Sequence, residues 1–186
     1  MHDTNDLFKK GNILLKDWLK SLKTRNLVNR LGVSIYSKDE LNNLPPEFSE
    51  AVQLPLSIYN QKFLLDGTLE KLQNGGSSIF LRSIFMQGLL VSHVSNWPKW
   101  IKIKEKKHHD SFCKFAEKKG YKLAELCLDF VKKFHQVDGI ILGFTNHHEL
   151  REVYNFWKND DRLIICDYKK WSLSNEDFID PRNWRS

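Results

Sequence analysis

Apolar residues recur every three to four positions in several stretches of the chain, as on the buried side of a helix. The first stretch predicts a helix over about residues 12–24, with Asn12 as its N-cap. From Asp110 onward, two apolar stripes on either side of Gly120 predict two successive helices, and another amphipathic helix is expected to begin near Asn146. Shorter helices are expected at residues 38–44 and 61–73.

Four short apolar runs lie between these helices. They are residues 31–34, 51–56, 79–83 and 139–142. Each is followed by a helical or polar segment, which is the pattern of parallel strands alternating with crossover helices. The sequence therefore predicts an α/β fold. Because no repeat or convincing linker divides the chain, residues 1–186 are expected to form a single domain.

An open sheet of four parallel strands leaves two edges bare, and a closed barrel removes such edges. An eight-stranded β/α barrel typically needs about 250 residues, and this chain has 186. The pattern alone therefore fits barrel-like units but not a whole barrel.

The formal net charge is +6, and the densest basic stretch is residues 99–107. Nucleic-acid binding is one interpretation, since Trp97 and Trp100 lie close by and could stack on bases. The lysines of this stretch mostly alternate with apolar residues, as on the solvated side of a helix or loop. That pattern favours an ordinary surface over a nucleic-acid interface.

The composition bears on the cellular location of the protein and on whether it has disulfides or a metal site. The chain has no run of 18 apolar residues and a polar N-terminus, so neither a membrane span nor a secretory signal is predicted and a cytoplasmic protein is expected. Three cysteines without C-x-x-C spacing favour reduced thiols over disulfides or zinc. The pairs His108–His109 and His147–His148 lack spaced partner ligands, so surface histidines rather than a metal site are expected.

Four segments resemble the second half of the aldo/keto reductase family in order and spacing. They are residues 31–37 (LGVSIYS), 52–60 (VQLPLSIYN), 81–90 (LRSIFMQGLL) and 141–152 (ILGFT followed by ELRE). The resemblance covers roughly residues 1–157. It implies a partial (β/α)8 barrel, approximately strands five to eight with their helices. It also implies an NAD(P)-dependent oxidoreductase that reduces a carbonyl by hydride transfer, with site residues at the carboxyl ends of the strands.

Carried over from the family, Ser34 and Gln53 would hydrogen-bond the carboxamide of the nicotinamide, and Arg82 would stack on its ring. Ser83 and the backbone N–H groups of residues 85–89 would line the pyrophosphate, with Gly88 allowing close approach. Without the resemblance, Ser34 and Gln53 are simply polar residues at a sheet rim.

The adenosine end would be bound by the segment that contains Gly143, Thr145 and Glu152, at the N-terminus of the last barrel helix. This segment departs from the pattern of NADPH-selective members, which carry cations at the positions of Gly143 and Glu149. The choice between NAD and NADP stays open here, because His147, His148 or Arg151 could replace those cations.

The family's catalytic Tyr, Lys and Asp belong to its first three strands and have no counterpart here. Met1-His2-Asp3 resembles the end of the fourth strand, which would make His2 the catalytic-site histidine. The chain is therefore expected to be truncated and inactive alone, with a small, sugar-like carbonyl compound as the substrate of the whole enzyme. The alternative is a non-catalytic half barrel that pairs with a second copy or with the missing N-terminal half.

Overall fold

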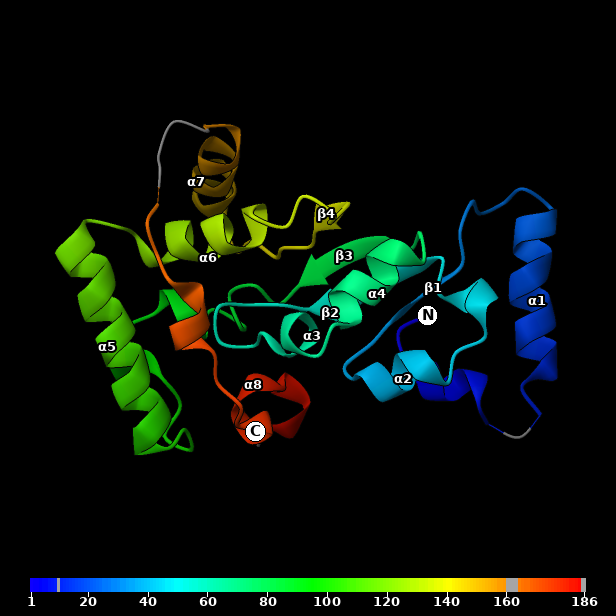
Figure 1. Cartoon of the computed structure of the whole chain (residues 1–186), viewed down its shortest axis with the longest axis horizontal. Coiled ribbons are helices and arrows are strands. Elements are labelled where there is room, and N and C mark those ends of the chain that lie inside the picture. The colour runs from blue at the N-terminus through cyan, green and yellow to red at the C-terminus, as the bar shows by residue number, and fades with distance from the viewer. Residues whose placement is uncertain (10, 160–163, 185–186) are drawn as a thin grey trace. The chain divides into compact units, whose positions relative to one another are not determined.

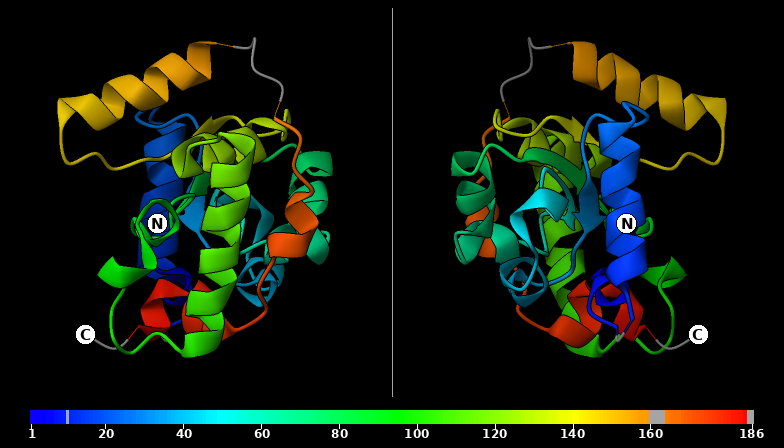
Figure 2. Two further views of the ribbon diagram at one scale, coloured as in Figure 1. Left: turned by 90° about the vertical axis from the view of Figure 1, so that its left-hand side faces the viewer. Right: turned by 90° about the vertical axis from the view of Figure 1, so that its right-hand side faces the viewer.

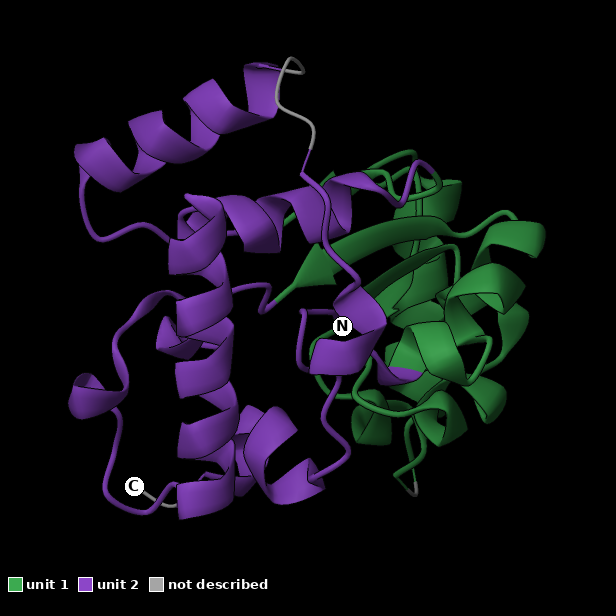
Figure 3. Cartoon of the chain, turned by 60° about the vertical axis from the view of Figure 1, so that its left-hand side comes forward, with its two compact units in different colours: residues 1–55, 63–82, 136–141 green, residues 56–62, 83–135, 142–186 purple. Residues whose placement is uncertain are grey.

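The computed structural model describes residues 1–9, 11–159 and 164–184. They form two compact units (Figure 3). Unit 1 contains residues 1–55, 63–82 and 136–141, and unit 2 contains residues 56–62, 83–135 and 142–186. Because the chain passes between the units after residues 55, 62, 82, 135 and 141, no single linker separates them. The expectation of a single domain stays a prediction.

A four-stranded parallel sheet organises unit 1 (Figure 1). Its strands are β1 (Gly32–Ser34), β2 (Ala51–Pro55), β3 (Ser78–Arg82) and β4 (Gly139–Ile140). They lie in the order β1-β2-β3-β4, and every neighbouring pair is parallel. An unreversed order is that of a barrel, whereas doubly wound sheets reverse their order at a switch point. The α/β prediction is confirmed, and the sheet resembles part of a (β/α)8 barrel.

The two faces of this sheet differ in chemistry. One face carries branched apolar side chains that are at most 4% exposed: Val33, Val52, Leu54, Ile79 and Leu81. The other face, set by the alternation of side chains along each strand, carries mainly small or polar residues and one aromatic residue, most of them half-buried. They are Gly32, Ser34, Ala51, Gln53, Ser78, Phe80, Arg82 and Gly139. In a closed barrel, this second face would be the interior.

Four helical segments accompany the sheet. They are α1 (Ile13–Thr24), α2 (Lys38–Asn42), α3 (Lys62–Leu65) and α4 (Thr68–Asn74). α1 begins directly after Asn12, as predicted, although the Asn12 side chain makes no cap hydrogen bond. The helix predicted over residues 61–73 is instead divided, because Gly67 adopts a left-handed φ of 76° between α3 and α4.

Unit 2 is built on α5 (Ile103–Lys119), α6 (Leu123–Lys132), α7 (His147–Lys158) and α8 (Glu176–Ile179). Gly120, at a φ of 67°, ends α5 where the sequence predicted a break. α5 begins at Ile103, earlier than the predicted Asp110. α7 contacts α6 (Figure 2), but none of its residues is fully buried.

Single 3-10 turns complete the described chain: Thr4–Leu7, Pro46–Phe48, Leu89–Val91, Val94–Asn96, Tyr168–Trp171 and Pro181–Asn183. Within residues 1–9, 11–159 and 164–184, no helix has the length and apolar character needed to cross a membrane.

Candidate functional site

Three of the predicted site residues meet at the carboxyl ends of adjacent strands in unit 1. Ser34 and Gln53 are register partners in β1 and β2, and the Ser34 hydroxyl donates to Gln53 Oε1 at 3.2 Å. Arg82, at the end of β3, donates from Nε to Ser34 Oγ at 3.2 Å. We call Ser34, Gln53 and Arg82 the strand-end cluster. Because parallel strands in register bring their ends to one edge, three residues far apart in sequence become neighbours.

Tyr36 lies beside this cluster, where the sequence analysis had not placed it. The Arg82 guanidinium carbon lies 4.0 Å from the centroid of the Tyr36 ring, and Arg82 Nη2 donates to the carbonyl of Ile35 at 3.2 Å. Together these contacts fix the plane of the guanidinium. The only signal in the sequence was an aromatic residue two positions after Ser34.

The turn that presents Tyr36 is fixed by the capping of α2. Ser37 Oγ accepts from Glu40 N at 3.3 Å, while Glu40 Oε2 accepts from Tyr36 N at 2.8 Å. This arrangement resembles a capping box, except that Glu40 accepts from the residue before the N-cap. It sets the direction of the chain directly after β1 and so places the aromatic ring beside Arg82.

The approach of β1 to β2 depends on Gly32. A Cβ built on Gly32 would lie 2.1 Å from the carbonyl oxygen of Ala51. No side chain fits that space, so glycine permits the strand spacing that pairs Ser34 with Gln53.

His2 follows a residue that lies on the outer edge of β1. Ser34 N donates to Met1 O at 2.8 Å, and the terminal amine of Met1 donates to Gly32 O. Bonds on both sides of Val33 are the pattern of a parallel partner. Met1 thus pairs with the outer edge of β1 in unit 1, and the role predicted for His2 stays a prediction. The His2 side chain itself is exposed.

The segment that follows β3 belongs to unit 2, and several of its residues have unusual backbone dihedral angles. Four of its residues have left-handed φ values: Ser83 at 59°, Met86 at 46°, Gln87 at 55° and Gly88 at 86°. Residues other than glycine rarely adopt left-handed φ values. Those that do are concentrated in functional loops. The N–H groups of Met86 and Gly88 donate within the loop, to Ser83 O and Phe85 O. These two groups, which were expected to line a pyrophosphate, are therefore engaged in turns.

The N-terminus of α7 is capped by its own side chains. Glu149 accepts from Thr145 N at 2.9 Å and from Thr145 Oγ1 at 2.7 Å, and Asn146 Oδ1 accepts from Glu149 N at 3.1 Å. We call Thr145, Asn146 and Glu149 the α7-cap cluster. The hydrogen bonds from Thr145 hold the pKa of Glu149 below its usual value. Gly143, just before this cluster, is exposed.

Glu152, predicted at the adenosine end, lies on an exposed part of α7. Its carboxylate pairs with the Lys122 ammonium at 3.1 Å, and both side chains are about two-thirds exposed. An exposed pair of this kind contributes little free energy. Glu152 is therefore not locked into this contact.

Tyr59, which follows β2 in the sequence, is a core residue of unit 2. It is fully buried, and its hydroxyl lies 2.8 Å from His109 Nδ1. Burial raises the pKa of Tyr59 far above its usual value, and burial lowers the pKa of His109. Trp97 stacks on His109 and is 4% exposed, so it cannot stack on a nucleic-acid base. Across the described ranges, no group of three or more His, Cys, Asp or Glu residues is arranged to hold a metal ion.

Comparison with known proteins bears on the family and the fold of the chain. Residues 14–171 match the model of the aldo/keto reductase family. A search of curated proteins finds no match. Two solved structures are similar to the chain: the thermostable aldo-keto reductase Tm1743, in complex with the inhibitor epalrestat, and the glycerol dehydrogenase AKR11B4 from Gluconobacter oxydans.

The likeness to Tm1743 concerns the fold. With Tm1743, the identity is 17%, the TM-score is 0.56, and the match covers 87% of this chain. With AKR11B4, the corresponding values are 19%, 0.48 and 80%. The chain spans 55% of the length of each.

Proposed function

This chain belongs to the aldo/keto reductase family, and from that premise we propose that it holds the nicotinamide end of NAD or NADP for the reduction of a small carbonyl compound. The observation that carries the proposal is the strand-end cluster, a hydrogen-bonded group of Ser34, Gln53 and Arg82 at the ends of three adjacent strands. Barrel enzymes place their sites at this end of the strands.

The chemistry of the cluster fits the cofactor. A nicotinamide carboxamide has two N–H donors and one carbonyl acceptor, so it needs partners that both donate and accept. The Ser34 hydroxyl and the Gln53 amide are such groups, and they lie 3.2 Å apart. Arg82 holds the Ser34 hydroxyl by donating to it. The cluster can therefore bind the amide and fix which face of the ring is presented.

When bound, the nicotinamide supplies the hydride that reduces a carbonyl carbon. In this proposal Ser34 and Gln53 orient the ring, Arg82 packs against it, and His2 positions the carbonyl substrate. Ser83 and Gly88 line the pyrophosphate, while Gly143, Thr145 and Glu152 contact the adenosine end. The proton donor comes from outside these 186 residues, so the chain alone reduces no carbonyl. Loss of a general acid typically lowers the rate by about 10² to 10⁴-fold.

For the cofactor we propose NAD over NADP. By the family resemblance, Glu149 stands where NADPH-selective members carry a cation. Its carboxylate already accepts two hydrogen bonds from Thr145 at the N-terminus of α7. A 2′-phosphate brought to this position would meet a like charge and lose the helix donors to Glu149.

Calorimetric titration with two ligands tests the nicotinamide site. NAD⁺ contains the carboxamide, whereas ADP-ribose shares the rest of the molecule without it. Gln53→Ala is expected to weaken NAD⁺ binding about tenfold, the effect of one or two hydrogen bonds, and to leave ADP-ribose binding unchanged. Gln73→Ala, at an exposed position of α4, is the matched control. If Gln53→Ala weakened the binding of both ligands equally, or weakened neither, the proposal would be contradicted.

A second candidate function is assembly with another half barrel. In unit 1, α1 exposes Ile13, Leu14 and Trp18 by 69%, 77% and 55%. In unit 2, α7 exposes Leu150 and Tyr154 by 50% and 54%. Apolar helix faces of this kind mark contact surfaces.

The occupant that we propose for the α1 face is a second copy of this chain. Light scattering after size-exclusion chromatography should then give a dimer whose dissociation constant rises in Leu14→Lys. Asp17→Lys, at an exposed position of the same helix, adds positive charge without removing an apolar side chain and is the control. A monomer at all concentrations would exclude this function.

A further inference from the structure

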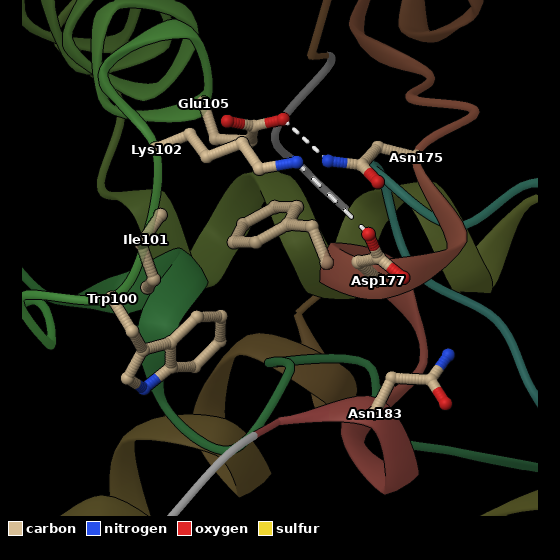
Figure 4. Close-up of a pocket in the computed structure, with 8 residues that line it drawn as sticks. Trp100, Ile101, Lys102, Glu105, Asn175, Asp177 and Asn183 are labelled. Atoms are coloured by element: carbon tan, nitrogen blue, oxygen red, sulfur yellow. Dashed lines mark hydrogen bonds and ion pairs between the residues drawn. The ribbon is translucent and has the colours of Figure 1, made fainter.

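Unit 2 contains a cavity of about 570 Å³ between the start of α5 and the segment around α8 (Figure 4). This volume falls within the usual range for small-molecule sites. The residues that line it are Trp100, Ile101, Lys102, Glu105, Asn175, Asp177, Phe178 and Asn183. None of them belongs to the strand-end cluster or the α7-cap cluster.

Glu105, in the first turn of α5, is the least expected residue in this wall. It is 4% exposed, and its Oε1 accepts from Asn175 Nδ2 at 2.7 Å. Its other oxygen, Oε2, is buried and has no hydrogen-bond partner within the described residues. A buried carboxylate oxygen without a donor costs free energy. Because Glu105 also lines the cavity, the charge of its carboxylate favours a positively charged ligand there.

The rest of the wall indicates the charge of that ligand. Asp177 adds a second carboxylate, and Lys102, the cationic residue among those that line the cavity, lies 4.0 Å from it with both side chains largely exposed. The cavity therefore carries an excess of negative charge in a chain whose formal charge is +6. Such a cavity attracts cations in preference to anions.

Aromatic rings complete the wall. Trp100 is 38% exposed and packs at 5.5 Å from Trp184, while Phe178 lies in the cavity wall. Figure 4 shows the Trp100 and Glu105 side chains lining the same space. An aromatic face beside a carboxylate suits an organic cation, because the ring attracts positive charge while the carboxylate accepts its hydrogen bonds.

We infer that this cavity binds a small organic cation that carries a primary ammonium or guanidinium group. The cationic group lies beside the Glu105 carboxylate, whose charge attracts it, and its apolar part packs against Trp100. Asp177 at the rim attracts the second charge of a diamine. The inference does not depend on the cofactor proposal, and its test is run without any nucleotide.

Calorimetric titration and amide NMR shifts of the whole chain test the site with three probes of similar length. Putrescine is the dication, butane-1,4-diol is its neutral counterpart, and succinate is the dianion. Putrescine is expected to bind and to shift the Asn175 side-chain amide signals. Glu105→Gln removes the carboxylate charge and should weaken putrescine binding about 10- to 100-fold.

Two further variants supply an independent test of the cavity and a matched control. Trp100→Leu should weaken putrescine binding by roughly 2- to 30-fold through loss of the indole that packs on its methylene chain, even if Glu105→Gln proves unstable. Glu117→Gln, at an exposed position of the same helix, is the matched control and should leave binding unchanged.

Three outcomes would overturn the inference. The first is butane-1,4-diol binding as tightly as putrescine, which would assign the cavity to neutral polyols. The second is putrescine binding that survives both Glu105→Gln and Trp100→Leu. The third is no putrescine binding up to about 10 mM by the wild type and by Lys102→Met, in which the competing side-chain ammonium is removed.

Discussion

The strand-end cluster and the α7-cap cluster differ in how far apart their partners lie in sequence. In the strand-end cluster, Ser34 reaches Gln53 and Arg82, which are 19 and 48 positions away. In the α7-cap cluster, Glu149 bonds only to Asn146 and Thr145, three and four positions away. The first cluster therefore exists only if the sheet of unit 1 forms, whereas the second needs one turn of helix.

The largest effect is expected from Gly32→Ala. Its Cβ would meet Ala51 O at 2.1 Å, so β1 must move away from β2. Overpacking of this severity should lower the free energy of unfolding by about 3 kcal/mol, measured by urea denaturation. Gly143→Ala is the control, because a Cβ there meets no described atom within 4 Å. Its stability should stay within about 1 kcal/mol of the wild type, and equal effects of the two substitutions would refute the comparison.

Arg82→Lys should have the next largest effect. Lysine keeps the charge but cannot bond to Ser34 Oγ and Ile35 O while lying flat on Tyr36. The free energy of unfolding should fall by about 1 to 2 kcal/mol, again measured in urea. Arg151→Lys, on the exposed side of α7, should change it by less than about 0.5 kcal/mol. A strand-end cluster that tolerates lysine would show that the guanidinium geometry is unimportant.

The sequence separation of contacting residues also explains which features could be predicted from the sequence. The four strands were predictable because their apolar runs are buried on one face, and parallel pairing then brings residues 34, 53 and 82 together. The stacking of Tyr36 on Arg82 was not predictable, because it depends on a turn fixed by the Ser37 and Glu40 caps.

The start of α5 was missed for a different reason. Residues 103–109 are rich in Lys and His and show no clear apolar stripe, so they indicated a solvated surface. The structure instead buries Glu105 and His109 there, against residues much later in the chain or from other loops. Contacts of this range leave no periodic signal in a sequence.

Glu149→Lys tests whether the α7-cap cluster selects the cofactor. The substitution replaces a charge that repels a 2′-phosphate with one that attracts it. It should raise the affinity for 2′,5′-ADP about tenfold relative to ADP, as measured by calorimetry. Glu70→Lys makes the same charge change at an exposed position of α4. An equal gain in that control would show that net charge, and not the position at α7, is responsible.

The smallest effect concerns the protonation of Glu149 itself. Because Thr145 donates two hydrogen bonds to the carboxylate, the pKa of Glu149 in the folded chain lies below its usual 4.5. The unfolded chain then binds the proton more readily, so the cap stabilises α7 above pH 4.5 and this contribution is lost as the pH falls through the folded pKa. Thr145→Val removes one donor, and NMR titration of the Glu149 carboxyl carbon should show its pKa moving back toward 4.5. An unchanged pKa would mean that the hydroxyl of Thr145 does not stabilise the carboxylate, and that the backbone N–H alone does so.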